Sequence, residues 1–153
     1  MKKPSDTPQQ LEIHIFFLDR SLGKEKLADL LRARNFIIEV HDEHFRRDEE
    51  DEVWLEACGK RKWIAITPDT NILRDERKMR VIGEHKVRIF FLSSNNPASE
   101  VWAQAIISAR REIETVLRKH RGPCMARITR MGNVWDAKEL TPLGREKKKK
   151  KAG

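Results

Sequence analysis

Three aspartates in this sequence stand where an apolar segment begins or ends. Asp19 is the first charged residue after the largely apolar run at 13–18, Asp69 follows a second run at 63–67, and Asp51 precedes an apolar segment of its own. Carboxylate oxygens are the ligands that Mg²⁺ and Mn²⁺ prefer in proteins. The chemistry open to these acids therefore depends on whether the fold brings them together.

The elements that must position these acids follow from the spacing of apolar residues. Short, nearly continuous apolar runs rich in β-branched and aromatic side chains predict strands buried on both faces. Such runs cover residues 13–18, 36–40, 63–67 and 87–92, with helical spacing between them. Strands that alternate with helices in this way predict an α/β three-layer sandwich with a mostly parallel central sheet.

The first two helices are predicted from amphipathic spacing and from end signals. Leu27, Leu30 and Leu31 share one face of a helix after the first strand. Asp51 is expected to be the N-cap of a short helix, and Gly59 is expected to end it, because these residue types are preferred at those positions.

The second half of the chain is predicted in the same way. Residues 68–85 are polar and are expected to be irregular. The longest helix is expected to begin at Asn96-Pro97, as N-cap and first helical residue, and to end at Gly122-Pro123. The segment CMARITRMGNV is expected to form a terminal strand or a hairpin around residues 131–133.

The geometry of these elements predicts where the acids meet. A helix over 51–58 is about 12 Å long, and a strand over 63–67 is about 17 Å long. In a right-handed βαβ unit the helix and the strand that follows it run antiparallel, so the start of the helix and the end of the strand share one edge of the sheet. Asp51 and Asp69 are therefore expected to meet at the carboxyl edge, where open α/β sheets bind ligands. Asp19 lies on that edge, and so, roughly, does the pair Asp42 and Glu43.

Converging carboxylates repel one another, and a bound divalent cation relieves that repulsion. An all-oxygen ligand set indicates Mg²⁺ or Mn²⁺. The alternative is that each acid is an ordinary helix-cap or strand-end carboxylate. His41 and His44 form a His-x-x-His pair that could hold zinc, but no obvious Cys or His partners complete four ligands.

Basic residues near the acids are candidates for binding an anionic substrate. By the same geometry Arg20, Arg74 and Arg77 lie near the acidic edge, whereas the basic residues 60–62 lie at the opposite edge.

Composition bounds the class of protein. The chain has 153 residues and a formal net charge of +8, and no apolar run approaches the roughly 20 residues of a membrane span. The segment REKKKKK at 145–151 carries a net charge of +5, which leaves +3 elsewhere and is typical of a disordered, solvated tail or of an arm that binds nucleic acid. Without an apolar signal segment the expected compartment is the cytoplasm. Cys58 and Cys124 are expected to be small buried thiols.

A resemblance emerges from several segments in order: FFLDRSLGK, HDEHF, DEVWL, WIAITPDTNILR, VRIFFLSS and ARITRMGNV. Together they resemble the PIN-like domain family related to VapC-type ribonuclease toxins, from about Ile13 to Val134. The resemblance divides the chain into a polar leader at 1–10, a PIN-like domain at 11–136 and a basic disordered tail at 137–153.

The resemblance implies a metal-dependent nuclease that cleaves RNA with Mg²⁺ or Mn²⁺. Asp19, Asp51 and Asp69 match the family's acids and are expected to bind the metal and act in catalysis, with Thr67 as the hydroxyl partner of Asp69. Either Glu43 or Asp42 could supply a further acid, and Glu43 is the candidate for orienting the attacking water.

The resemblance also bears on substrate and partners. Arg20, Thr67 and Arg74 are expected to bind substrate. RNA is the expected partner, an antitoxin protein and a homodimer stay open, and no membrane partner is expected.

Two other readings of the residues stay open. A receiver-like phosphoacceptor domain would also place aspartates and Mg²⁺ at strand ends, although Asp19 lacks the adjacent acid of such pockets and Asp51 would be unexplained. A module that binds RNA or a protein without cleaving it is the other reading.

Overall fold

The computed structural model describes residues 13–22, 25–92 and 98–135. The predicted leader at 1–10, the whole predicted basic tail at 137–153 and the predicted helix start at Asn96-Pro97 lie outside these ranges.

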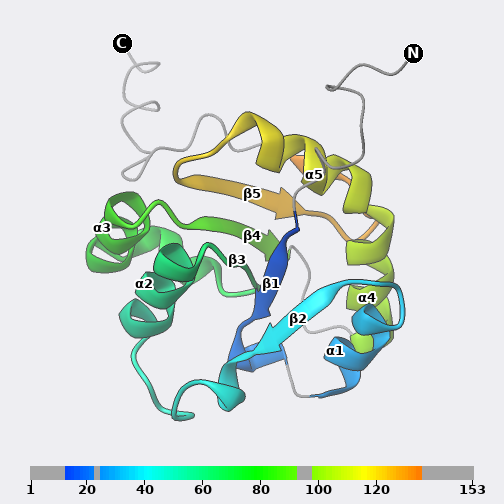
Figure 1. The fold of residues 1–153 in the computed structure, drawn as a ribbon, viewed down its shortest axis with the longest axis horizontal. Helices are drawn as coiled ribbons and strands as arrows, with labels where there is room; N and C mark the ends of the chain where they lie inside the picture. Colours follow the sequence, from blue (N-terminus) through cyan, green and yellow to red (C-terminus); the bar gives the residue numbers. More distant parts are fainter. Residues whose placement is uncertain (1–12, 23–24, 93–97, 136–153) are drawn as a thin grey trace.

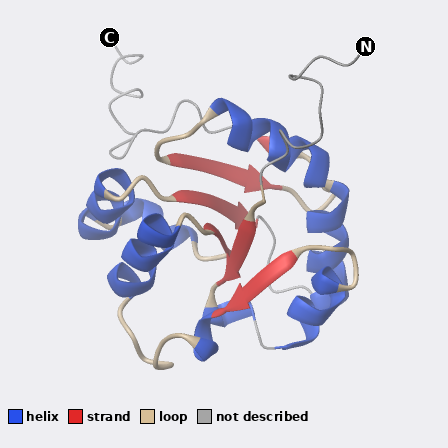
Figure 2. Cartoon of the chain, viewed as in Figure 1, coloured by secondary structure: helices blue, strands red, loops and turns tan. Residues whose placement is uncertain are grey.

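A six-stranded sheet forms the middle layer of the fold. Figures 1 and 2 show helices packed around this sheet. The strands lie in the order β2-β1-β3-β4-β5-β6, and the first five are parallel. Their apolar sequences explain their place, because nearly every residue of the inner strands is buried. The bounds are β1 Ile15–Leu18, β2 Ile37–Val40, β3 Ile64–Thr67, β4 Arg88–Leu92, β5 Cys124–Ile128 and β6 Val134–Trp135.

Helices cover both faces of the sheet and complete three layers. The helices are α1 Glu25–Arg32, α2 Asp51–Arg61, α3 Glu76–Glu84, α4 Ser99–Ser108 and α5 Arg110–Lys119. Helix α1 packs on α4, and α2 packs on α3. Figure 1 shows α2 and α3 on one side of the sheet and α1, α4 and α5 on the other. The predicted α/β three-layer sandwich with a mostly parallel sheet is confirmed.

Helix α2 differs from the prediction at both ends. Its N-cap is Glu50, and Asp51 is the first helical residue. The prediction of an Asp51 cap was wrong because that carboxylate accepts hydrogen bonds from side chains further along the chain. Gly59 does not end the helix, which runs to Arg61 and closes on Lys62 with φ of 60°.

Gly59 instead permits close packing between helices. A Cβ atom at Gly59 would lie 2.4 Å from the carbonyl oxygen of His85, so only glycine lets α2 approach the end of α3 this closely.

The segment predicted to be irregular contains two helices, so that prediction was wrong. Asp69 opens the 3₁₀ helix η5, Thr70–Arg74, and the Asp75 carboxylate accepts hydrogen bonds from the N–H groups of Arg77 and Lys78 as N-cap of α3. Helix α3 buries only two apolar residues, Met79 and Ile82, so its amphipathic pattern is a weak helix signal in this charged segment.

The predicted long helix is two helices, because the chain turns at Ala109 between α4 and α5. The β5–β6 hairpin approaches at this point: a Cβ atom at Gly132, whose φ is 89°, would lie 2.5 Å from the Cβ of Ser108. The hairpin alternative for residues 124–134 is confirmed by the antiparallel pairing of β5 and β6.

Two smaller findings complete the fold. Cys58 and Cys124 are buried, as predicted, and burial raises the pKa of the Cys58 thiol. Within the ranges described above, no helix combines the length and apolar character needed to cross a membrane.

Candidate active site

The strand order places a switch point between β1 and β3. From β1 the chain leads outward to β2 on one side, whereas β3, β4 and β5 follow in turn on the other. Ligands of open α/β sheets bind at the carboxyl ends of the strands that flank such a point. Asp19 directly follows β1, Thr67 is the last residue of β3, and Asp69 lies two residues beyond it. The fold therefore brings two of the predicted acids to the position where this class of sheet binds ligands.

Asp19 is a buried carboxylate with several donors. Its exposed fraction is 6%. Its Oδ2 atom accepts hydrogen bonds from the Thr67 hydroxyl at 2.6 Å and from the Ser21 hydroxyl at 3.0 Å. The Ser21 N–H donates to Oδ1 at 3.4 Å. These donors offset part of the cost of burying the acid and hold the carboxylate in one orientation.

Thr67 links the ends of the two strands. The fully buried Thr67 hydroxyl donates to Asp19 and accepts a hydrogen bond from the Asp69 N–H at 3.1 Å. The Thr67 hydroxyl therefore pairs with the side chain of Asp19 and with the backbone N–H of Asp69. The Asp69 side chain accepts from the Asn71 N–H at 3.0 Å, which turns the chain into η5.

Asp51 is anchored by two side chains. Its Oδ1 atom accepts a hydrogen bond from the Trp54 indole N–H at 2.9 Å, and its Oδ2 atom accepts from the Lys78 ammonium at 2.9 Å. The Trp54 ring stacks on Phe17 of β1 with ring centroids 5.4 Å apart. This contact ties the start of α2 to the centre of the sheet.

Lys78 joins Asp51 to the acids that follow β3. Its ammonium lies 2.9 Å from Asp51 and 3.8 Å from Asp75, and the charge of Asp69 also acts on it. Burial lowers the pKa of Lys78, but the hydrogen bond to Asp51 and the charges of Asp51, Asp75 and Asp69 outweigh burial and raise the pKa above its ordinary value. Asp51 therefore pairs with a cation supplied by the chain itself, and the charge of Asp69 adds to the field that this cation feels.

Lys78 was not predicted as a site residue, because the helix that carries it was not predicted. The Asp75 cap, Glu76 in the first turn, and apolar residues at 79 and 82 would have indicated a helix there. Even so, nothing local shows that α3 packs on α2 and turns Lys78 toward Asp51.

Glu43 lies in another cluster. Its carboxylate groups with Glu39 and His44, whose ligand atoms all lie within 4.8 Å of one another, and His44 Nε2 lies 2.7 Å from Glu39. Within the described ranges, Asp19, Asp51 and Asp69 do not form so tight a group.

The other residues of HDEHF contact partners other than the three aspartates. Asp42 lies 3.0 Å from His41 Nδ1 and 3.2 Å from Arg47. His41 is buried beside Phe17 and Phe45, and the structure does not bring it into the cluster of His44 that could bind a metal. The His-x-x-His pair therefore does not act as one zinc site here.

The predicted substrate-binding arginines lie on the surface near the strand ends. Arg20 directly follows Asp19 and donates to the Glu49 carbonyl at 3.3 Å. Arg74 ends η5 and donates to the Asn71 side chain at 3.0 Å. Arg77 lies 3.7 Å from Glu52. Each guanidinium has five N–H donors, so these contacts leave donors for an anion.

The donor chemistry of Asp19, Asp51 and Asp69 fits a hard divalent cation, because all the available ligand atoms are carboxylate oxygens. One Asp51 oxygen is already held by Lys78, so a cation that binds Asp51 through that oxygen competes with the ammonium.

Comparison with known proteins gives two matches. A family described as "PIN like domain" matches residues 15–94, from β1 to the carboxyl edge of β4 and across all three aspartates. The Mycobacterium tuberculosis (strain ATCC 25618 / H37Rv) protein named "Putative ribonuclease VapC45" is 28% identical over 97 residues, which span 61% of this chain and 67% of that protein. No solved structure gives a significant match. Since the family match spans more than half of the chain and includes the candidate site, the chain belongs to the PIN-like domain family.

Proposed function

We propose that this protein is a PIN-type ribonuclease that cleaves RNA phosphodiester bonds with Mg²⁺ or Mn²⁺. The family supports a nuclease, and the relative named a ribonuclease supports RNA as substrate. The observation that carries the proposal is the hydrogen-bonded line from the Asp69 N–H through Thr67 to Asp19 across the β1/β3 switch point, with Asp51 tied to Lys78 beside it. Buried hydrogen bonds hold these acids in fixed orientations at the edge where such sheets bind ligands. This arrangement is suited to chemistry that depends on carboxylates.

Asp19, Asp51 and Asp69 are the proposed metal ligands. When bound, the cation supplies an activated water and neutralises charge that develops on the phosphate.

The chain's own residues prepare the acids for that role. Thr67 and Ser21 fix the orientation of Asp19, and the Trp54 indole fixes Asp51. Because their rotamers are locked by hydrogen bonds, the acids lose little further freedom when a ligand binds. Lys78 lowers the repulsion that the acids present to an RNA phosphate.

The remaining predicted residues act around this centre. Arg20 and Arg74 are proposed to bind RNA phosphates as charged donors. Glu43 is proposed to act on water or substrate from its cluster with Glu39 and His44.

The sheet order does not separate this proposal from a receiver-like phosphoacceptor, because unrelated α/β folds share the order 2-1-3-4-5. The family match favours the nuclease. We further propose that the protein is the toxin of a toxin–antitoxin pair, which co-purification with the product of a short neighbouring gene would test.

The catalytic assignment is tested by Asp19→Asn, Asp51→Asn and Asp69→Asn. Each variant is expected to fold, as judged by circular dichroism, and to cleave single-stranded RNA at least about 100-fold more slowly in Mg²⁺ or Mn²⁺. Asp29→Asn is the matched control, because the Asp29 side chain on α1 is 71% exposed. Cleavage near the wild-type rate in the three variants would overturn the proposal, as would full activity in a chelator.

A further inference from the structure

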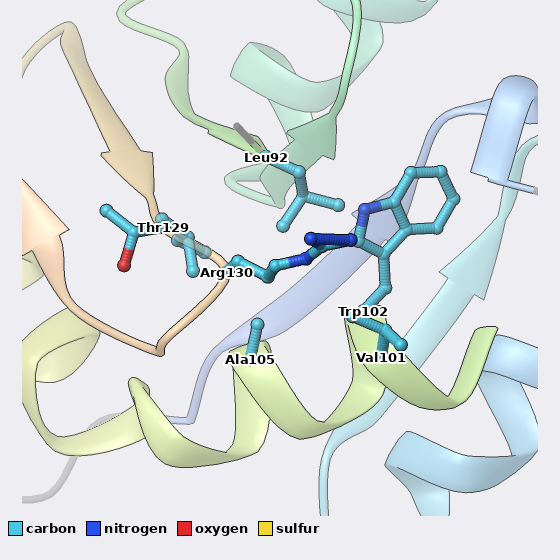
Figure 3. Close-up of a pocket in the computed structure, with 7 residues that line it drawn as sticks. Leu92, Val101, Trp102, Ala105, Thr129 and Arg130 are labelled. Carbon is cyan, nitrogen blue, oxygen red and sulfur yellow. The ribbon is translucent and has the colours of Figure 1, made fainter. Parts of the chain in front are cut away.

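A small pocket lies on the same carboxyl edge as the acids, beyond the ends of β4 and β5. Figure 3 shows that α4 forms its floor. About 160 Å³ of space, part of it open to solvent, lies between its lining residues. These are Leu92, Val101, Trp102, Ala105, Ile128, Thr129 and Arg130.

Trp102 contributes a buried hydrogen-bond donor that has no partner. The residue is 6% exposed, and its indole Nε1 forms no hydrogen bond to any of the described residues. Buried polar groups are nearly always paired, so an orphaned N–H in a pocket wall indicates a ligand that accepts a hydrogen bond. Trp54 provides the contrast, because its indole N–H donates to Asp51.

Arg130 contributes a charged donor to the same pocket. Its side chain lies across the pocket, and in Figure 3 its guanidinium points toward the side where the Trp102 indole lies. No hydrogen bond or ion pair engages the guanidinium in the described part of the chain. Arg47 and Arg77, in contrast, each lie beside a carboxylate.

The two donors define the chemistry of the ligand. The lining includes no acidic residue, so nothing in it repels an anion. A guanidinium beside a neutral N–H matches the oxygens of a phosphate, which accept hydrogen bonds and carry negative charge.

The position of the pocket relates it to the acids. Thr67 pairs in register with Phe91, and Leu92, the next residue, lines the pocket. Neighbouring strands lie about 4.8 Å apart, so the pocket is one to two strand spacings from the end of β3. An RNA strand that crosses the carboxyl edge therefore passes from one group to the other.

We propose that Trp102 and Arg130 form a subsite for a backbone phosphate of the RNA substrate, next to the phosphate at the aspartates. This subsite rests on the proposed ribonuclease function. The interior is too narrow for a water molecule and the Trp102 Nε1 atom is buried, so the phosphate binds at the mouth only after the exposed Arg130 side chain turns outward and opens the way to the indole N–H.

The indole N–H resonances of Trp54 and Trp102 provide separate reporters in an NMR titration of the full chain. The Trp54 N–H bonds to Asp51 and reports on Mg²⁺ at the acids. The Trp102 N–H is expected to shift when a short single-stranded RNA binds to the Asp69→Asn variant, which is used to prevent cleavage. Inorganic phosphate alone is expected to shift it less, and at higher concentration.

Substitutions then test each donor in RNA binding. Arg130→Gln is expected to weaken RNA binding about threefold to tenfold, and to reduce the log–log salt slope by about 0.7, because one phosphate contact on a single strand is lost. Trp102→Phe is expected to weaken binding about threefold with an unchanged slope, because the lost donor is neutral. The matched controls are Arg118→Gln at an exposed position on α5 and Trp135→Phe, whose side chain is 66% exposed.

The outcomes separate this subsite from the catalytic proposal. RNA that binds without moving the Trp102 resonance, or equal affinities of the Arg130 and Arg118 variants, would overturn the subsite whatever the aspartate variants do. A shift with inorganic phosphate but not with RNA would show a site for a small free anion and would also overturn it. A Trp102 shift with RNA, together with undiminished cleavage by the aspartate variants, would support the subsite and refute the catalytic assignment.

Discussion

Two parts of one sheet edge carry opposite chemistry. At the ends of β1 and β3 lie acceptors: Asp19 and Asp69, with Asp51 beside them, and each is already engaged by donors of the chain. At the ends of β4 and β5 lie donors, Trp102 and Arg130, for which residues 13–22, 25–92 and 98–135 supply no acceptor. The acid half is internally organised before any ligand arrives, whereas we propose that the donor half is completed only by a bound phosphate. A cation suits the first half and an anion the second, which together are the charges of a metal-assisted reaction on RNA.

The largest expected difference between the halves is kinetic. Asp69→Asn should lower kcat by about 100-fold or more and change KM little, because Asp69 is proposed to hold the cation that acts on the reacting phosphate. Arg130→Gln should raise KM by about threefold to tenfold and leave kcat within about twofold, since it removes uniform binding. Steady-state cleavage of one short RNA measures both. If both variants lost kcat alone, the division of the edge into a catalytic and a binding half would be wrong.

The next difference concerns stability. Thr67→Val removes a buried donor from the Asp19 carboxylate and should lower the free energy of unfolding by about 1–3 kcal/mol. Thr67→Ser should restore most of it. Thr129→Val in the donor half removes only an acceptor for the exposed Asn133 N–H, and should cost no more than about 1 kcal/mol. Urea unfolding measures all three, and equal costs at the two threonines would contradict the view that the acid half is the organised one.

A smaller effect is expected for metal affinity. Lys78→Met removes the cation that shares Asp51, so Mn²⁺ should bind about tenfold more tightly, as for a partly exposed charge pair. Lys60→Met is the control, because Lys60 pairs with Glu56 on the surface of α2. Isothermal titration with Mn²⁺ measures the affinities. Unchanged affinity in the Lys78 variant would mean that a metal does not compete with this ammonium.

The smallest effect is a pH dependence confined to the acid half. Folding raises the pKa of Lys78, so its contribution to stability is fully present below the ordinary value of 10.5 and is lost as the pH rises through the raised value. Wild-type protein should therefore lose stability more steeply than Lys78→Met above about pH 10.5. Arg130→Gln should follow the wild type, because arginine stays charged throughout. Urea unfolding between pH 9 and pH 12 checks this, and parallel curves for the wild type and Lys78→Met would contradict it.

Local pattern was sufficient where a segment carries its own signal. The strands were predictable because their continuous apolar runs can be satisfied only by burial on both faces. Prediction from local pattern failed where the contact that decides the structure comes from a residue far away in the chain. Gly59 carries a strong stop signal for a helix, yet the helix continues to Arg61, and the missing side chain lets the His85 carbonyl approach α2. Helix α3 has few apolar residues and draws its stability from packing on α2, which a local pattern does not show.

The same division runs through the candidate site. The sequence by itself determined the fold class and placed Asp19, Asp51 and Asp69 at one edge, because strand ends and crossover handedness follow from local rules. Only the tertiary structure decided what each acid contacts. Thr67 reaches Asp19 across 48 residues and Lys78 reaches Asp51 across 27, while Glu43 joins Glu39 and His44 instead. It also decided that the Trp102 N–H has no partner in the described part of the chain, because hydrogen-bond satisfaction depends on every neighbouring element and no spacing in the sequence encodes it.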